Sequence, residues 1–263
     1  MPPAAGTEVY AADHPPVMAR GYSFNDTELD NMLADVYTIV RDEAGASEVE
    51  VFLAGIATTE FADATLQQVL RSDRQLEDWR IGEAIAECYL VEHRDCEFPW
   101  PCGRDLKNPD SSPAGTDLVG FQQPGGASAR FSFAEVKTST QCKYPPSLIY
   151  GRHGLKQQLD DLRDSAAVKD GLVKYLGLHA PGRPWVATYR QAASRYIHDR
   201  SDVTIFGVLV RDVDPNHLDC SVRANELCQQ CPGLTVIELL ALYLPAGSIP
   251  TLPQRISIYE EGP

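Results

Sequence analysis

The sequence lacks a hydrophobic run long enough to cross a membrane. A membrane-spanning helix needs roughly 18 to 20 consecutive apolar residues. The longest apolar stretch, residues 234–244, is shorter and contains Glu238. Residues 1–16 also lack the basic and then apolar segments of a secretory signal. We therefore expect a cytoplasmic protein that makes no membrane contact.

Signatures of several common enzyme classes are missing as well. The sequence contains no Walker motif, no Rossmann fingerprint and no nucleophile elbow. It therefore gives no support to nucleotide hydrolysis or to serine hydrolysis.

The sequence lacks the even number of cysteines that is typical of a disulfide framework, since it has seven cysteines. An odd number with uneven spacing, in a chain without a secretory signal, indicates reduced thiols. Cys228 and Cys231 form a CxxC pair, which could be half of a zinc site or a redox pair. The simpler interpretation is a pair of buried helix cysteines.

Positive charge is scarce. The chain has 23 Lys and Arg residues and 37 Asp and Glu residues, so its net charge is −14. Nucleic-acid binding depends largely on the neutralisation of phosphates by Lys and Arg. An acidic chain that acts on nucleic acid therefore needs a local basic groove or a partner that supplies one. Some of the carboxylates would be neutralised if they bind a metal.

The 263 residues suffice for one large domain, or for one domain with an added lobe. Residues 1–20, rich in Pro and Ala, are predicted to be a loose arm. Hydrophobic periodicity predicts helices at 26–42, through most of 60–92, at 155–178 and at 223–231. Strands are predicted at 47–56, 203–213 and 234–244, the last with a buried helix as the alternative. The order of these elements indicates an α/β fold.

A hairpin is predicted from residues 116–123 and 130–140, because a Gly-rich turn joins two short strands. Glu135 and Lys137 are two residues apart, so they share one face of the sheet. Strand pairing can bring Asp117 beside Glu135. The Val136 side chain would point into the core, and its carbonyl could be a further metal ligand.

This arrangement suits a metal-dependent hydrolase. Mg²⁺ prefers one or two carboxylates together with waters and substrate phosphate. Two adjacent carboxylates repel each other unless a cation joins them. Such a metal polarises a phosphate and activates water, and a lysine beside it can orient or deprotonate that water. We expect Mg²⁺, or Mn²⁺, as the cofactor.

The pattern GTDLVGF…FAEVKTST resembles the PD-(D/E)xK, or restriction-endonuclease-like, nuclease superfamily. The resemblance gives Asp117 and Glu135 as the two motif acids and Lys137 as the motif lysine, with Thr116 in place of the usual proline. It implies a mixed central sheet flanked by helices. It also implies an acid on the preceding helix, Glu83, with Glu87 one turn later as the alternative, and a polar residue on the following helix, Gln157 or Gln158.

With GEAIAE at 82–87, the same motifs resemble the nuclease-like subunits of Hachiman anti-phage defence systems. That resemblance implies a DNA nuclease whose helicase partner supplies most of the grip on DNA. The alternative is an inactive subunit of the same fold that binds or regulates. Residues 71–263 would form the nuclease domain, and residues 1–70 an N-terminal extension with partner docking as a hypothesis.

Two basic regions are candidate substrate contacts. Lys143, Arg152 and Lys156 could steer a phosphodiester backbone, with solvation as the alternative role. In the loop at 94–116, Trp100 could stack on a base while Arg94, Arg104 and Lys107 meet phosphates. The alternative for this segment is a proline-fixed surface loop.

Overall fold

The computed structural model describes residues 5–53, 56, 59–70, 76–105 and 115–260. The strands are β1 (Thr7–His14), β2 (Val17–Ser23), β3 (Cys96–Glu97), β4 (Leu118–Gln122), β5 (Arg130–Ser139), β6 (Val203–Arg211) and β7 (Val236–Tyr243). The α-helices are α1 (Asp26–Arg41), α2 (Glu43–Leu53), α3 (Glu60–Leu70), α4 (Asp78–His93), α5 (Leu155–Asp164), α6 (Ala166–His179), α7 (Val186–His198), α8 (Ser221–Cys228) and α9 (Leu252–Ser257).

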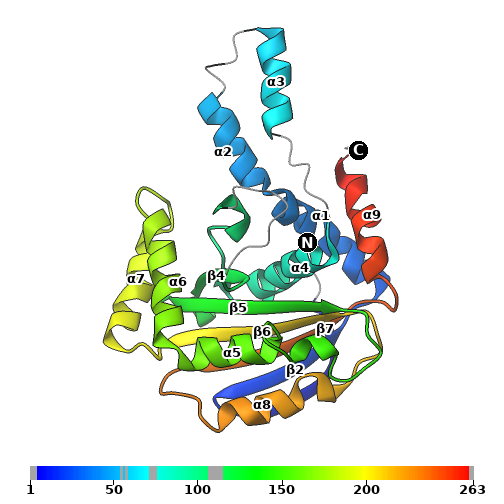
Figure 1. The fold of residues 1–263 in the computed structure, drawn as a ribbon, viewed down its shortest axis with the longest axis vertical. Helices are drawn as coiled ribbons and strands as arrows, with labels where there is room; N and C mark the ends of the chain where they lie inside the picture. The colour runs from blue at the N-terminus through cyan, green and yellow to red at the C-terminus, as the bar shows by residue number, and fades with distance from the viewer. Residues whose placement is uncertain (1–4, 54–55, 57–58, 71–75, 106–114, 261–263) are drawn as a thin grey trace.

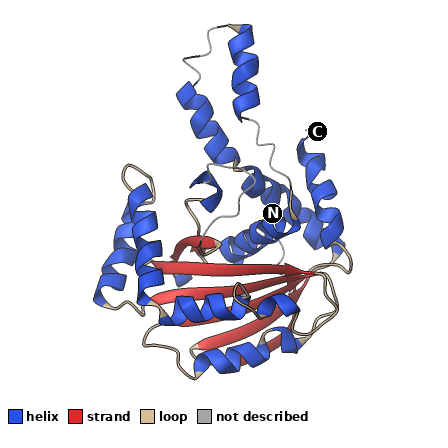
Figure 2. Ribbon diagram, viewed as in Figure 1, coloured by secondary structure: helices blue, strands red, loops and turns tan. Residues whose placement is uncertain are grey.

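Within the described residues, seven strands form one mixed sheet in the order β1-β2-β7-β6-β5-β4-β3 (Figure 2). The pairs β2/β7, β7/β6 and β6/β5 are parallel, whereas β1/β2, β5/β4 and β4/β3 are antiparallel. Every residue of β6 is buried, as expected for a central strand that is covered on both faces. The expected α/β fold with a mixed central sheet flanked by helices is confirmed.

Helices cover both faces of this sheet, and each face has its own hydrophobic core. Helices α5, α7 and α8 pack on one face, over a core that includes Phe131, Phe133 and Leu159 (Figure 1). Helices α1, α4 and α9 form the layer on the other face, over a core that includes Val136 and Ile85. The predicted inward direction of the Val136 side chain is thus confirmed.

The prediction of a loose arm at residues 1–20 is wrong for residues 7–20, because β1 and β2 form a hairpin within the sheet, and residues 1–4 lie outside the described residues. Strand β2 pairs with β7 along its whole length, from Val17 to Ser23. The ring of Tyr10 in β1 packs edge-on against Tyr243 in β7, with 6.3 Å between centroids. Local composition missed this hairpin because β2 joins the sheet through β7, which lies more than 200 residues along the chain. Helix α1, which follows β2 in the sequence, packs on α4. Helices α2 and α3 project away from the sheet (Figure 1).

The prediction of a strand at residues 47–56 is also wrong, because residues 43–53 form α2. The side chains of Val51 and Phe52 are 79% and 81% exposed. No strand of the described sheet lies beside this segment, so the helix satisfies its backbone groups locally. A partner-docking role for this region stays a prediction.

The remaining predicted elements agree with the structure more closely. The hairpin, the helices near 26–42 and 76–93 and the strands at 203–213 and 234–244 are confirmed. The predicted helix at 155–178 is two helices, because Ser165 ends α5 and caps α6 by accepting a hydrogen bond from the Val168 amide. Helix α7 was not predicted. Across the helices of the described residues, none combines the length and the apolar character needed to cross a membrane.

Candidate active site

The β4–β5 hairpin brings the two predicted motif acids together. In its antiparallel register Leu118 is opposite Ala134, so Asp117, immediately before β4, comes beside Glu135. Oδ2 of Asp117 accepts a hydrogen bond of 2.7 Å from the amide of Val136. This bond fixes the Asp117 carboxylate against the backbone of the strand that carries Glu135.

Lys137 completes the predicted trio. Its Nζ lies 3.9 Å from Oδ2 of Asp117 and 3.9 Å from Oε2 of Glu135. The Glu135 side chain is only 3% exposed, and its Oε2 has no hydrogen-bond partner among the described residues. A buried carboxylate oxygen without a donor is costly. The ammonium group of Lys137 offsets only part of that cost.

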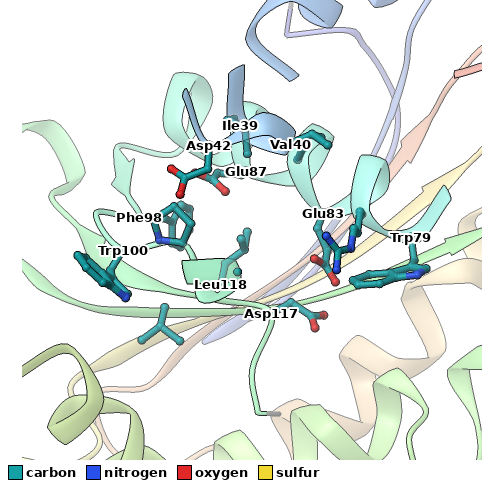
Figure 3. Close-up of a pocket in the computed structure, with 15 residues that line it drawn as sticks. Ile39, Val40, Asp42, Trp79, Glu83, Glu87, Phe98, Trp100, Asp117 and Leu118 are labelled. Atoms are coloured by element: carbon teal, nitrogen blue, oxygen red, sulfur yellow. The ribbon is translucent and has the colours of Figure 1, made fainter. Parts of the chain in front are cut away.

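Glu83 joins these residues from α4, on the other face of the sheet. Its side chain points toward Asp117 (Figure 3). Gly82 makes the close approach of α4 possible, because a Cβ at this position would overlap Oγ1 of Thr138 on β5. The absence of a side chain at position 82 therefore places Glu83 beside the hairpin.

Burial and mutual repulsion raise the pKa values of these acids. Burial and then the charge of Asp117 raise the pKa of Glu135 to about 9, while Lys137 opposes both effects. Burial and then Asp117 raise the pKa of Glu83 to about 8, against Lys137 and Arg80. The pKa of Asp117 is raised by burial, against Lys137 and the amide of Val136. Without a cation the site therefore favours protonated carboxyl groups.

A second acidic pair lies one helical turn further along α4. Burial raises the pKa of Glu87 to about 8, with a further contribution from Asp42 at the end of α1. Asp42 accepts two hydrogen bonds from Arg104, at 2.7 and 2.8 Å. Of the two acids predicted on this helix, Glu83 thus belongs to the Asp117 site and Glu87 to this second pair.

An open cavity connects the two acidic pairs, and its walls are largely apolar (Figure 3). The apolar lining comes from α1, α4, the segment after β3 and β4, and comprises Ile39, Val40, Trp79, Ala84, Phe98, Trp100, Pro101, Leu118 and Val119. We call this space the α4 cavity. Of its residues, Asp42, Trp79 and Phe98 were not identified from the sequence, because they come from separate segments without a shared motif.

The loop at 94–105 is held by its own contacts, which argues against the predicted contacts to bases and phosphates. Trp100 stacks on His179, with 4.3 Å between centroids and 12° between planes. Arg94 is bound to Glu238 at 2.7 Å, and Arg104 is bound to Asp42. Tertiary partners thus occupy these groups. Lys107 lies outside the described residues.

Of the predicted basic contacts, Lys143 and Arg152 lie on the segment between β5 and α5, and Lys156 lies in the first turn of α5. Lys143 and Arg152 are exposed, and Lys156 is paired with Glu226 at 3.2 Å. Buried Arg211 donates hydrogen bonds to the carbonyls of Gln141 and Lys143, and so fixes the chain just after β5.

The two glutamines of α5 differ in their surroundings. Gln157 is exposed and donates to Asp161 at 2.9 Å. Oε1 of Gln158 is buried without a hydrogen-bond partner among the described residues. Gln158 is therefore the better candidate of the two for a role inside the protein.

The residues present suit Mg²⁺ or Mn²⁺ better than zinc. In the described part of the chain, no three His, Cys, Asp or Glu side chains converge as a ready-made metal cage, and this includes the surroundings of Cys228 and Cys231. Mg²⁺ needs only one or two carboxylates, with water and phosphate as further ligands. Asp117, the unpartnered oxygen of Glu135, nearby Glu83 and the Val136 carbonyl supply hard oxygen atoms of this kind.

Comparison with known proteins gives no relative from which a function could be transferred. The chain matches no family model, and no curated protein matches it significantly. Functional inference therefore rests on the site itself.

Proposed function

We propose that this chain is a metal-dependent nuclease with a restriction-endonuclease-like core, which hydrolyses phosphodiester bonds of DNA. The observation that carries the proposal is the buried Glu135 carboxylate, which has an unpartnered oxygen beside Asp117 and Lys137. A protein tolerates such a cluster of raised pKa values where a bound cation or a reaction compensates for it.

The roles of the residues follow from their positions. Asp117 and Glu135 would hold Mg²⁺ or Mn²⁺, with Glu83 and the Val136 carbonyl as further oxygen donors. When bound, the metal supplies Lewis-acid polarisation of the phosphate and a more acidic water. Lys137 lies within 4 Å of both acids, so its ammonium group can orient the attacking water and offset charge on the phosphate.

The acidic net charge supports a role for a partner in substrate binding. The net charge is −14, and Lys156, one of the predicted substrate contacts, is already paired with an acid. Loss of phosphate neutralisation weakens DNA binding steeply. We therefore propose that a DNA-binding partner such as a helicase delivers the substrate, as in a cytoplasmic anti-phage defence system.

The test is a plasmid-cleavage assay with Mg²⁺ or EDTA, run with and without the product of the neighbouring gene. Wild-type chain should cleave in Mg²⁺, whereas Asp117→Asn, Glu135→Gln and Lys137→Met should not. Asp161→Asn and Lys174→Met are the matched controls, because both residues are exposed on helices. Full cleavage by the three site variants would refute the site.

A non-cutting binding or regulatory subunit is the second candidate. It is favoured by the observation that no three-ligand metal cage is preformed in the described residues. This candidate predicts a stable complex with the partner and no cleavage in Mg²⁺ or Mn²⁺, with the partner present or absent. Cleavage that Glu135→Gln abolishes would exclude it.

A further inference from the structure

The α4 cavity is continuous with the proposed cleavage site and shares Glu83 and Asp117 with it. Glu83 and Asp117 line it at one end, and Glu87 lines it at the other. Glu83 and Glu87 are four residues apart on α4, which corresponds to about 6 Å along the helix axis. This separation is comparable with the reach from a phosphate to the base of the same nucleotide.

The walls between these two ends suit a flat apolar group. Trp79, Phe98 and Leu118 contribute to them, and aromatic side chains are the usual surfaces on which unpaired bases stack.

The far end of the cavity offers an acceptor for hydrogen bonds. Asp42 there is already satisfied, because its carboxylate accepts from Arg104 and from the amide of Gly45. Glu87 makes no hydrogen bond or ion pair with any other residue that the structure describes. Its carboxyl group lies beside that of Asp42 (Figure 3). Acidic side chains at this end disfavour a phosphate and favour a neutral group that carries N–H donors.

We propose that the α4 cavity binds one unpaired nucleobase next to the scissile phosphate, with Glu87 accepting hydrogen bonds from the amino or imino edge of the base. The inference rests on the proposed nuclease function and specifies its substrate. DNA would be cut where a nucleotide is single-stranded or displaced from its duplex, because a paired and stacked base cannot enter the cavity.

The first test is a cleavage assay with labelled single-stranded oligonucleotides that carry one abasic position, scanned along the strand. Glu87→Ala should lower kcat/KM on the intact strand by up to about ten-fold, as expected for loss of one hydrogen bond. At one abasic position next to the cleaved bond, wild type and Glu87→Ala should cleave equally. The control Glu92→Ala removes an exposed acid from the same helix and should change nothing.

An equal effect of Glu87→Ala on intact strands and on every abasic strand would overturn the inference and leave the proposed nuclease function intact. Equal cleavage of blunt duplex and single strand by wild type would overturn it as well. The variant Glu87→Met keeps a side chain of similar size but has no oxygen acceptor, so it separates loss of the acceptor from loss of packing.

A second readout does not depend on cleavage. Trp79 is one of three tryptophans and is half-buried in the cavity wall. A short single-stranded oligonucleotide in EDTA should quench the protein fluorescence, and Trp79→Phe should remove most of that quenching. If wild type cuts no substrate, the proposed nuclease function fails. The quenching result then tests by itself whether the α4 cavity binds a base. Absence of quenching in wild type would overturn the inference.

Discussion

Gly82 offers the sharpest test of how the fold builds the site. It lies on α4 where this helix crosses β5, and a Cβ there would overlap Oγ1 of Thr138 and lie 3.1 Å from the Thr138 Cβ. The variant Gly82→Ala adds that atom. Helix α4 must then move away from β5, and Glu83 must move with it.

The expected change in stability is the balance of two effects. Alanine is favoured over glycine in a helix interior by about 0.8–1.0 kcal/mol. Overpacking of a buried contact costs about 1–3 kcal/mol. The net effect of Gly82→Ala is therefore a loss of between roughly 0 and 2 kcal/mol in the free energy of unfolding, measured by urea denaturation. Cleavage should fall by about 100-fold, the cost of an ångström-scale misplacement in an active site.

The double variant Gly82→Ala/Thr138→Ala separates this mechanism from a general loss of stability. Oγ1 of Thr138 is buried without a hydrogen-bond partner among the described residues, so its removal sacrifices no such bond. The space it leaves accepts the new methyl group at position 82. Stability and cleavage should both recover in the double variant, as a positive coupling in the double-mutant cycle. A stabilised and fully active Gly82→Ala would refute the reasoning.

Three further predictions concern charge. Burial and Asp117 raise the folded-state pKa of Glu135 from its ordinary value of 4.5 to about 9, so this group contributes stability below pH 4.5 that is lost as pH rises toward 9. Melting temperatures in EDTA should therefore fall between pH 5 and 9, and Glu135→Gln should flatten this slope; an unchanged slope would contradict the assignment. Millimolar Mg²⁺ should raise the melting temperature of wild type at pH 7.5, because a ligand that binds only the folded state stabilises it, and Asp117→Asn should remove most of the increase. Arg211→Met should cost about 3–5 kcal/mol in urea denaturation, since it leaves buried Asp219 unpaired, whereas Arg255→Met breaks an exposed ion pair and should cost no more than about 1 kcal/mol. Equal losses in these two variants would contradict the burial argument.

Local pattern predicted the parts of the fold in which neighbours along the chain decide the structure. The alternation of Phe131, Phe133 and Glu135 predicted the second hairpin strand. The Gly-rich turn before it predicted that this strand pairs with the preceding one. The apolar run at 203–213 gave β6, because a strand buried on both faces needs apolar residues throughout. The failures came where a distant partner decides. Residues 7–14 form a strand because β2 and β7 extend the sheet to them, and residues 43–53 form a helix because no strand edge lies beside them.

The sequence by itself determined that Asp117, Glu135 and Lys137 share one patch. A hairpin and the two-residue period of a strand suffice for that result, and both are local properties. Only the tertiary structure decided which helical acid joins them, since Glu83 and Glu87 differ by a single turn of α4. The close approach of Gly82 to Thr138 and the position of Asp42 separate these two acids. Only the packing of α1, α4 and β4 creates the α4 cavity beside the patch, because its walls come from segments that are distant in the sequence.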